Sequence, residues 1–133
     1  MADISKIKLD NSTYNIKDST ARIISNYSTT EQVIGTWTNG KPLYRSIIDI
    51  GNLPDNSFKN IGINIPNINK ITNIHGIATD GTYTVPIPSS GYATLGQRIE
   101  VYIYANSILS IATGGNYSSF TGEIIIEYTK STD

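Results

Sequence analysis

Two short stretches of this sequence combine tyrosine with glycine, serine and asparagine, a mixture suited to molecular recognition. They are residues 89–92 (SSGY) and residues 114–118 (GGNYS). A tyrosine ring can stack on a sugar, glycine lets the backbone approach a ligand, and amide and hydroxyl groups bond to sugar hydroxyls. We therefore predict a ligand-binding surface made by these side chains: Tyr92, Asn116, Tyr117 and Ser118. The alternative is that both stretches simply have the composition of turns.

Residues that usually carry catalysis are scarce. The chain has no cysteine and a single histidine, His75, so a thiolate zinc site and a catalytic triad lack their usual components. His75 stands within an apolar run, and we interpret it as a structural histidine. The carboxylates that a glycoside hydrolase could use are expected at water-facing strand or turn positions: Asp49, Asp80, Glu100, Glu123 and Glu127. We predict no enzymatic activity, no cofactor and no metal site.

The composition points to one small domain with many turns. The 133 residues have a net charge of −1, and charged residues make up 16% of the chain, against roughly 25% in an average soluble domain. No block of lysine and arginine could neutralise a row of phosphates, so we do not expect nucleic-acid binding. No apolar run is long enough to span a membrane, and we expect neither membrane insertion nor a signal peptide.

Alternating apolar residues indicate short antiparallel strands. Asn39-Gly40 and Asp80-Gly81 each separate two extended stretches, which is the strongest short signal for a β-hairpin. Pro86 places its strand at a sheet edge, because proline cannot donate to a ladder. Strands about ten residues apart with turns between them predict an antiparallel β-sandwich, jelly-roll-like in arrangement.

The strand pattern also predicts which side chains form the core. In the clearest strand, 97–104, the charged and tyrosine side chains face away from the apolar ones: Arg98, Glu100, Tyr102 and Tyr104. The predicted core consists of these residues: Ile48, Ile50, Ile61, Ile63, Ile65, Ile99, Val101, Ile103, Ile124 and Ile126. Between residues 65 and 77 isoleucine recurs at every third position, which could suggest a helix or a β-solenoid. Because the intervening residues are poor helix formers, we predict a turn at Pro66-Asn67 and then a strand near 71–79.

The chain divides into an arm, a linker and a domain. Residues 4–17 have the pattern of a small hairpin, and residues 18–25 could form a turn or two of helix. We assign residues 1–26 to an N-terminal arm and residues 27–31 to a linker. Residues 32–133 then form the sandwich domain.

Several segments resemble known proteins. Residues 1–9 (MADISKIKL) and 13–22 (TYNIKDSTAR) resemble the opening of many bacteriophage structural proteins. Residues 27–31 (YSTTE) and 34–45 (IGTWTNGKPLYR) resemble the start of a C-terminal module in phage fibre and receptor-binding proteins. Residues 118–122 (SSFTG) and 127–130 (EYTK) fit the end of that module.

The resemblance implies a homotrimeric fibre or appendage of the virion, attached to other phage structural proteins through residues 1–26. It names no catalytic residue. Its sandwich would bind a polysaccharide of the host surface. Two alternatives stay open at this point, a capsid-decorating or assembly protein with no host ligand and a polysaccharide-degrading enzyme.

Overall fold

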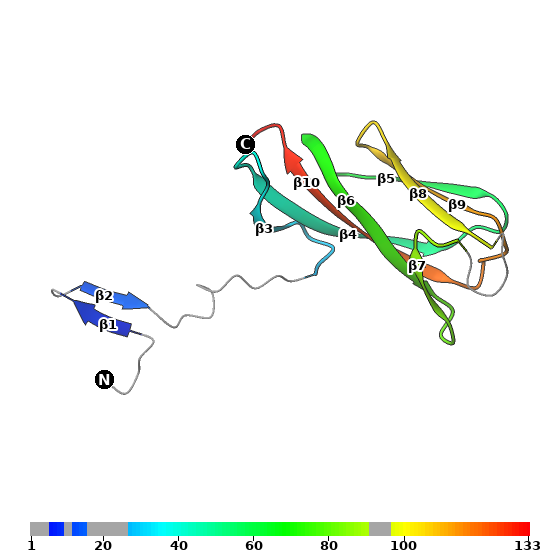
Figure 1. The fold of residues 1–133 in the computed structure, drawn as a ribbon, viewed down its shortest axis with the longest axis horizontal. Coiled ribbons are helices and arrows are strands. Elements are labelled where there is room, and N and C mark those ends of the chain that lie inside the picture. Colours follow the sequence, from blue (N-terminus) through cyan, green and yellow to red (C-terminus); the bar gives the residue numbers. More distant parts are fainter. Residues whose placement is uncertain (1–5, 10–11, 16–26, 91–96) are drawn as a thin grey trace.

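The structure, a computed structural model, describes residues 6–9, 12–15, 27–90 and 97–133. Every helix or strand defined within these ranges is a β-strand (Figure 1). They are β1 (Lys6–Leu9), β2 (Ser12–Asn15), β3 (Gln32–Thr36), β4 (Pro42–Asn52), β5 (Phe58–Gly62), β6 (Ile68–Thr79), β7 (Thr84–Ile87), β8 (Ile99–Tyr104), β9 (Ile108–Thr113) and β10 (Thr121–Lys130). The helix expected near 18–25 lies outside the described residues. Within those residues no helix is long and apolar enough to cross a membrane.

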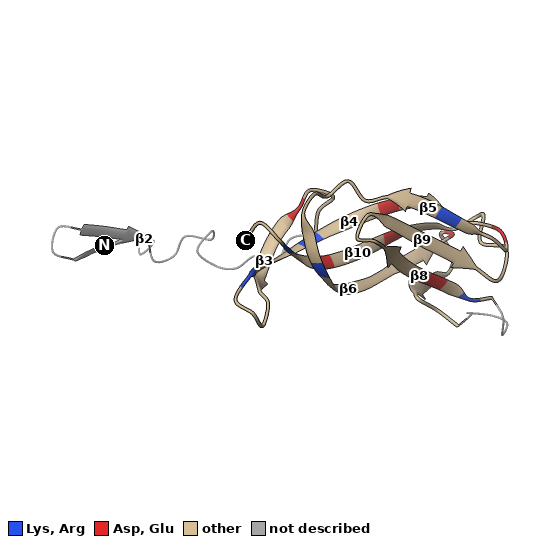
Figure 2. Ribbon diagram, turned by 90° about the horizontal axis from the view of Figure 1, so that it is seen from above, with Lys and Arg blue, Asp and Glu red and all other residues tan. Residues whose placement is uncertain are grey.

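The hairpin predicted near the N-terminus is confirmed. β1 and β2 pair antiparallel, with Lys6 opposite Asn15 and Leu9 opposite Ser12. The remaining strands form a sandwich of two antiparallel sheets, as predicted. The larger sheet has the strand order β3-β4-β10-β6-β7 and the smaller sheet the order β5-β9-β8. The β3 end of the larger sheet extends beyond the smaller one (Figures 1 and 2).

The core lies between the two sheets. Leu109 and Ile111 of the smaller sheet and Ile124 and Ile126 of β10 are fully buried, and each such side chain contributes about 1.5–3 kcal/mol to stability. Every residue predicted for the core either belongs to this buried cluster or packs against it. The alternation of apolar residues therefore placed these ten side chains correctly, although the prediction did not include Leu109 and Ile111 of β9.

The three-residue spacing of isoleucine in β6 has a structural cause. Ile68, Ile71 and Ile74 lie opposite Lys130, Tyr128 and Ile126 of β10, and the register shifts once between each successive pair. Each shift is a β-bulge, which inserts one extra residue into β6. Two residues per repeat plus one bulged residue give a period of three, so these isoleucines all pack against the core.

The predicted turns are found at their predicted places. Gly40 has a φ of +82° in the β3–β4 turn, and Asn67 has a φ of +63° before β6. Ala105 and Asn106, with φ of +52° and +54°, form the tight turn between β8 and β9, and paired positive φ values match the right-handed twist of a hairpin. Pro86 lies in β7, an edge strand of the larger sheet, as predicted.

Residues 27–31, predicted as a linker, lie against the sandwich. The backbone N–H of Ile47 donates to the carbonyl oxygen of Ser28 at 2.9 Å. The guanidinium of Arg45 lies 3.8 Å from the centre of the Tyr27 ring. The described part of the sandwich therefore begins at Tyr27.

Candidate binding face

Tyr117, one of the predicted ligand-binding residues, is a core residue. Only 1% of it is exposed. Its hydroxyl donates to the carbonyl oxygen of Gln97 at 2.5 Å, and its ring meets the edge of Phe120 with the centroids 5.0 Å apart. A ring buried on all sides has no face on which a sugar could stack, so the expected role of Tyr117 in stacking is corrected to one in packing.

The two polar residues predicted beside Tyr117 are exposed, but their groups bond within the loop. The Asn116 side-chain oxygen accepts from the backbone N–H of Ser118 at 3.0 Å and from its hydroxyl at 2.7 Å. The Asn52 side-chain amide in turn donates to the carbonyl oxygen of Ser118 at 2.9 Å. These bonds shape the turn, which is the alternative given above. Tyr92 lies outside the described residues.

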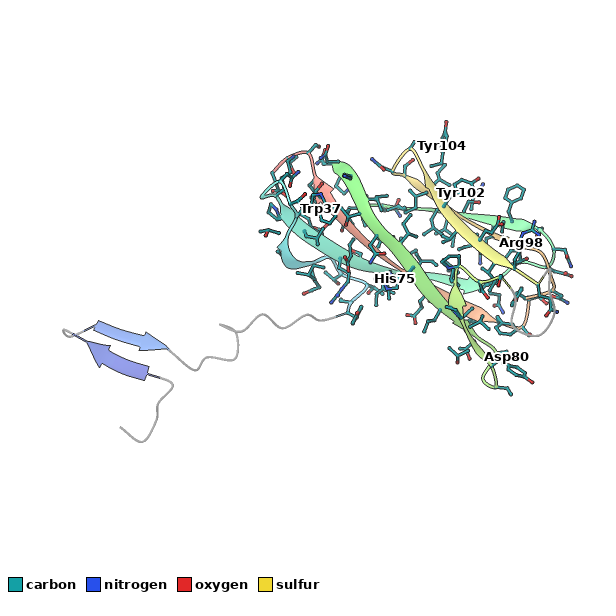
Figure 3. The ribbon with its side chains drawn as sticks, in the orientation of Figure 1. Trp37, His75, Asp80, Arg98, Tyr102 and Tyr104 are labelled. Carbon is teal, nitrogen blue, oxygen red and sulfur yellow. The ribbon has the colours of Figure 1, made fainter. Side chains whose placement is uncertain are left out.

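Three of the exposed aromatic side chains among the described residues lie elsewhere, on the outer face of the smaller sheet. Tyr102 is 57% exposed, and Tyr104 and Phe58 are each 67% exposed. Tyr102 and Tyr104 point outward from β8 because Ile99, Val101 and Ile103 face the core. In Figure 3, Tyr104 projects away from the sandwich near the end of β8.

The strand register defines the composition of this outer face. Directly opposed residues of antiparallel strands lie on the same side of a sheet. Tyr102 therefore shares a row with Ser110 and Asn60, and Glu100 shares one with Ala112 and Phe58. Tyr104 is opposite Ile108. We name this surface the tyrosine face, and it comprises Phe58, Asn60, Glu100, Tyr102, Tyr104, Ile108, Ser110 and Ala112.

The strands of the tyrosine face differ in the size of their outward side chains. The central strand β9 contributes small side chains, Ser110 and Ala112, with Ile108 at the end of the row. The flanking strands contribute the larger ones, Tyr102 and Tyr104 from β8 and Phe58 from β5. Neighbouring strands are about 4.8 Å apart and alternate residues of one strand about 6.8 Å apart. Tyr102 and Tyr104, two residues apart on β8, are therefore about 6.8 Å apart along the strand.

Ser110 has a buried hydroxyl group in the middle of this face. Ser110 is 1% exposed, and among the described residues its Oγ has no hydrogen-bond partner. Leaving a buried hydroxyl unpaired costs about 1–3 kcal/mol. The cross-strand neighbours of Ser110 are Tyr102 and Asn60. A buried unpaired hydroxyl calls for an explanation, and a bond to a ligand is one candidate.

The tyrosine face has almost no net charge. Its one acidic side chain, Glu100, is paired with Arg98, whose Nε lies 3.1 Å from the carboxylate. Figure 2 shows this acid and this base near the start of β8 and no charged position on β9. Exposed pairs of this kind contribute little to stability. The ligand chemistry of the face is therefore set by rings, an amide and a hydroxyl.

A second group of polar side chains converges where the chain enters the sandwich. The Tyr128 hydroxyl donates to the Glu31 carboxylate at 2.5 Å and lies 3.1 Å from the Ser46 hydroxyl. Lys130 pairs with the other oxygen of Glu31 at 2.7 Å. Burial, followed by the bond to Glu31, raises the pKa of Tyr128. Each of these groups is already bonded to another, so the network is suited to anchoring the start of β3 to β4 and β10.

A hollow of about 380 Å³ adjoins this network. Glu31, Ser46 and Lys130 line one side of it, and Ile48 and Ile63 line the other. It has no aromatic lining among the described residues. Because it offers no ring on which a sugar could stack, it is a weaker candidate for glycan binding than the tyrosine face.

Two other residues that could carry chemistry, Asp80 and His75, lie in surroundings that point to structural roles. Asp80 accepts from the backbone N–H of Tyr83 at 2.7 Å and of Thr82 at 2.8 Å, and these bonds lower the pKa of its carboxyl. Its carboxylate thus holds the β6–β7 turn together. His75 is half-buried on β6, opposite Ile125. Among the described residues no group of three or more histidine, aspartate and glutamate side chains could hold a metal.

Part of the tyrosine face was predictable from the sequence. The alternation in 97–104 placed Tyr102 and Tyr104 away from the core, but the prediction assigned binding to the loops. The contribution of Phe58 and Asn60 depends on the pairing of β5 with β9, a contact between strands far apart in the chain.

Comparisons with known proteins do not extend this picture. No protein-family model matches the chain, and neither curated proteins nor solved structures gave a match. The function therefore has to be argued from the geometry of the faces and from the segments that resemble phage proteins.

Proposed function

We propose that the protein is a non-enzymatic appendage of a bacteriophage particle whose sandwich binds a glycan on the host surface through the tyrosine face. The observation that carries the binding role is the pair of exposed tyrosines on one side of β8, Tyr102 and Tyr104. Rings on alternate residues of a strand form a regular series of stacking platforms. Asn60, which is exposed in the row of Tyr102, supplies a polar group that fixes a sugar's orientation.

The virion setting is supported by the sequence segments that resemble phage fibre proteins. Residues 1–26 would attach the protein to other structural proteins of the particle, and the protein would function on the released virion. A receptor-binding appendage gains from presenting several copies together, because linked sites add avidity without new contacts. We accordingly propose a homotrimer.

A second candidate function is a capsid-decorating or assembly protein with no host ligand. The specific observation in its favour is that Phe58 and Ile108, which are 67% and 38% exposed, share the tyrosine face. Exposed apolar side chains of this kind also occur where proteins dock. This alternative predicts that the face binds empty particles and no polysaccharide.

Binding of the full-length protein to an array of bacterial surface polysaccharides tests the proposal. The Tyr102→Ala/Tyr104→Ala double variant should lose binding about tenfold or more, with an unchanged melting temperature. Tyr83→Ala is the matched control, because Tyr83 is also an exposed tyrosine, at 53%, but lies beside β7. Equal binding by the double variant and the native protein would contradict a role of the tyrosine face in glycan binding.

The attachment role of the arm has its own test. Removing residues 1–26 should abolish incorporation into particles and leave polysaccharide binding intact. A truncated protein that is incorporated normally would show that the arm does not attach the protein to the virion.

A further inference from the structure

The charge of the tyrosine face restricts the class of glycan that it can bind. Phe58, Asn60, Tyr102, Tyr104 and Ile108 carry no charge, and the single carboxylate of Glu100 is already paired with Arg98. An anionic polymer presents a phosphate or carboxylate in every repeat, and each of these needs a cationic partner when water is excluded. The face offers one guanidinium, at one end of β8 (Figure 3). A polycationic chain would likewise meet only one carboxylate.

We infer that the ligand of the tyrosine face is an uncharged polysaccharide, and that the Ser110 hydroxyl becomes one of its hydrogen-bond partners. This inference rests on the proposed function and adds to it the ligand class and a residue that determines recognition. An uncharged sugar has an apolar C–H face that suits Tyr102 and Tyr104 and a hydroxyl edge that suits Asn60 and Ser110.

The state of Ser110 suggests how binding would proceed. In the free protein its Oγ is buried and has no partner among the described residues, and its nearest cross-strand neighbours are Tyr102 and Asn60. Rotation of either exposed side chain towards a sugar would uncover the hydroxyl. The same movement would place a ring or an amide on the ligand, so uncovering Ser110 and engaging the sugar would occur together.

The experiment measures binding of the full-length protein to two panels of soluble polymers. The neutral panel contains polymers of glucose, mannose, galactose and N-acetylglucosamine, and the anionic panel contains teichoic acid and hyaluronan. We expect binding to a member of the neutral panel only, lost in Tyr102→Ala/Tyr104→Ala and retained in Tyr83→Ala. Raising the salt concentration should leave the affinity nearly unchanged, because no ion pair forms.

The possible failures are distinguishable. Binding of an anionic polymer that requires both tyrosines would overturn the ligand class and leave the proposed function standing. The absence of any polymer binding, or binding that persists in the double variant, would overturn both. Binding to a second copy of the chain through the same tyrosines, with no polymer bound, would also overturn both.

The proposed hydrogen bond between the Ser110 hydroxyl and the sugar has a separate test. Ser110→Ala should weaken binding of the neutral polymer by about fivefold without lowering the melting temperature. Ser46→Ala is the matched control, since Ser46 is also a buried serine, 3% exposed, but lies in β4. It should leave the affinity unchanged. An unchanged affinity in Ser110→Ala would show that the hydroxyl does not contact the ligand.

Discussion

Tyrosine side chains in this protein differ in the contacts they can make, because some are buried and others are exposed. Tyr117 and Tyr104 show this contrast, since Tyr117 is 1% and Tyr104 67% exposed. The glycine-rich surroundings of Tyr117 gave no sign that its hydroxyl would bond to Gln97 across the loop. The loop composition predicted an exposed ring at Tyr117, and this was wrong because side-chain burial depends on contacts distant in the chain.

The two buried serines allow a prediction at this scale. Ser110 has no hydrogen-bond partner among the described residues, whereas Ser46 lies 3.1 Å from the Tyr128 hydroxyl. Ser110→Ala should therefore raise the free energy of unfolding by about 1 kcal/mol, because it removes an unpaired buried hydroxyl. Ser46→Ala should lower it by about 1 kcal/mol. Urea unfolding of both variants provides the check, and destabilisation by Ser110→Ala would indicate that the hydroxyl is paired.

Among the structural elements, β6 shows where sequence patterns mislead and why. Alternation with a period of two predicted the buried residues of β8 and β10, because the strand pairing inserts no extra residue into either strand. In β6 the two bulges convert the period to three, and only the pairing with β10 reveals this. Beyond the bulges Gly76 and Ala78 face inward, which leaves Ile77 47% exposed on the outer face.

Gly76 provides a prediction for this element. A Cβ at position 76 would overlap the carbonyl oxygen of Glu123 and come within 2.7 Å of the Ile124 side chain. Because the obstruction includes backbone, Gly76→Ala should lower the free energy of unfolding by about 3 kcal/mol. Gly62→Ala is the control, since its Cβ would meet nothing closer than 3.9 Å. Equal stability of the two variants would contradict the close pairing of β6 with β10.

The tyrosines of β4 and β10 predict a loss of stability at high pH. The hydrogen bond to Asp133 raises the pKa of Tyr44 to about 12, and burial raises that of Tyr128, from about 10 in an unfolded chain. A raised pKa in the folded state stabilises the protein fully below pH about 10, and this contribution is lost as the pH rises towards 12.

Denaturant unfolding between pH 9 and 12 measures this loss. Tyr128→Phe should show a smaller decline over that interval than the native protein, because its ring no longer titrates. The comparison uses the slope with pH and not the absolute stability, since the variant also loses the bonds to Glu31 and Ser46. Parallel declines in the two proteins would show that Tyr128 does not contribute.

At the scale of the whole molecule, the proposed function requires several binding faces acting together. One face whose contacts are two rings and a few hydrogen bonds binds weakly, since an aromatic contact contributes about 0.5–1.5 kcal/mol beyond its area. Copies held in one assembly would convert such weak contacts into firm attachment. The all-β fold and its core were predictable from the sequence, whereas the assembly and the ligand rest on the proposals above.

The expected assembly is a homotrimer of the full-length chain. Light scattering coupled to size exclusion should give three times the mass of the 14.5 kDa chain, independent of concentration over the accessible range. In the proposed arrangement the tyrosine face stays free, so Tyr102→Ala/Tyr104→Ala should leave the mass unchanged. A monomer mass would contradict the trimer, and a loss of assembly in the double variant would favour the capsid-decorating or assembly role.

Mapping of backbone amide NMR shifts tests whether the tyrosine face binds an uncharged glycan. Short neutral oligosaccharides of glucose, mannose, galactose and N-acetylglucosamine would be titrated into the labelled full-length protein. We expect a bound sugar to shift amides of β5, β8 and β9, with the largest changes around Asn60, Tyr102 and Ser110. Shifts confined to residues 114–118 or to the surroundings of Glu31, or no shifts with any of these sugars, would contradict it.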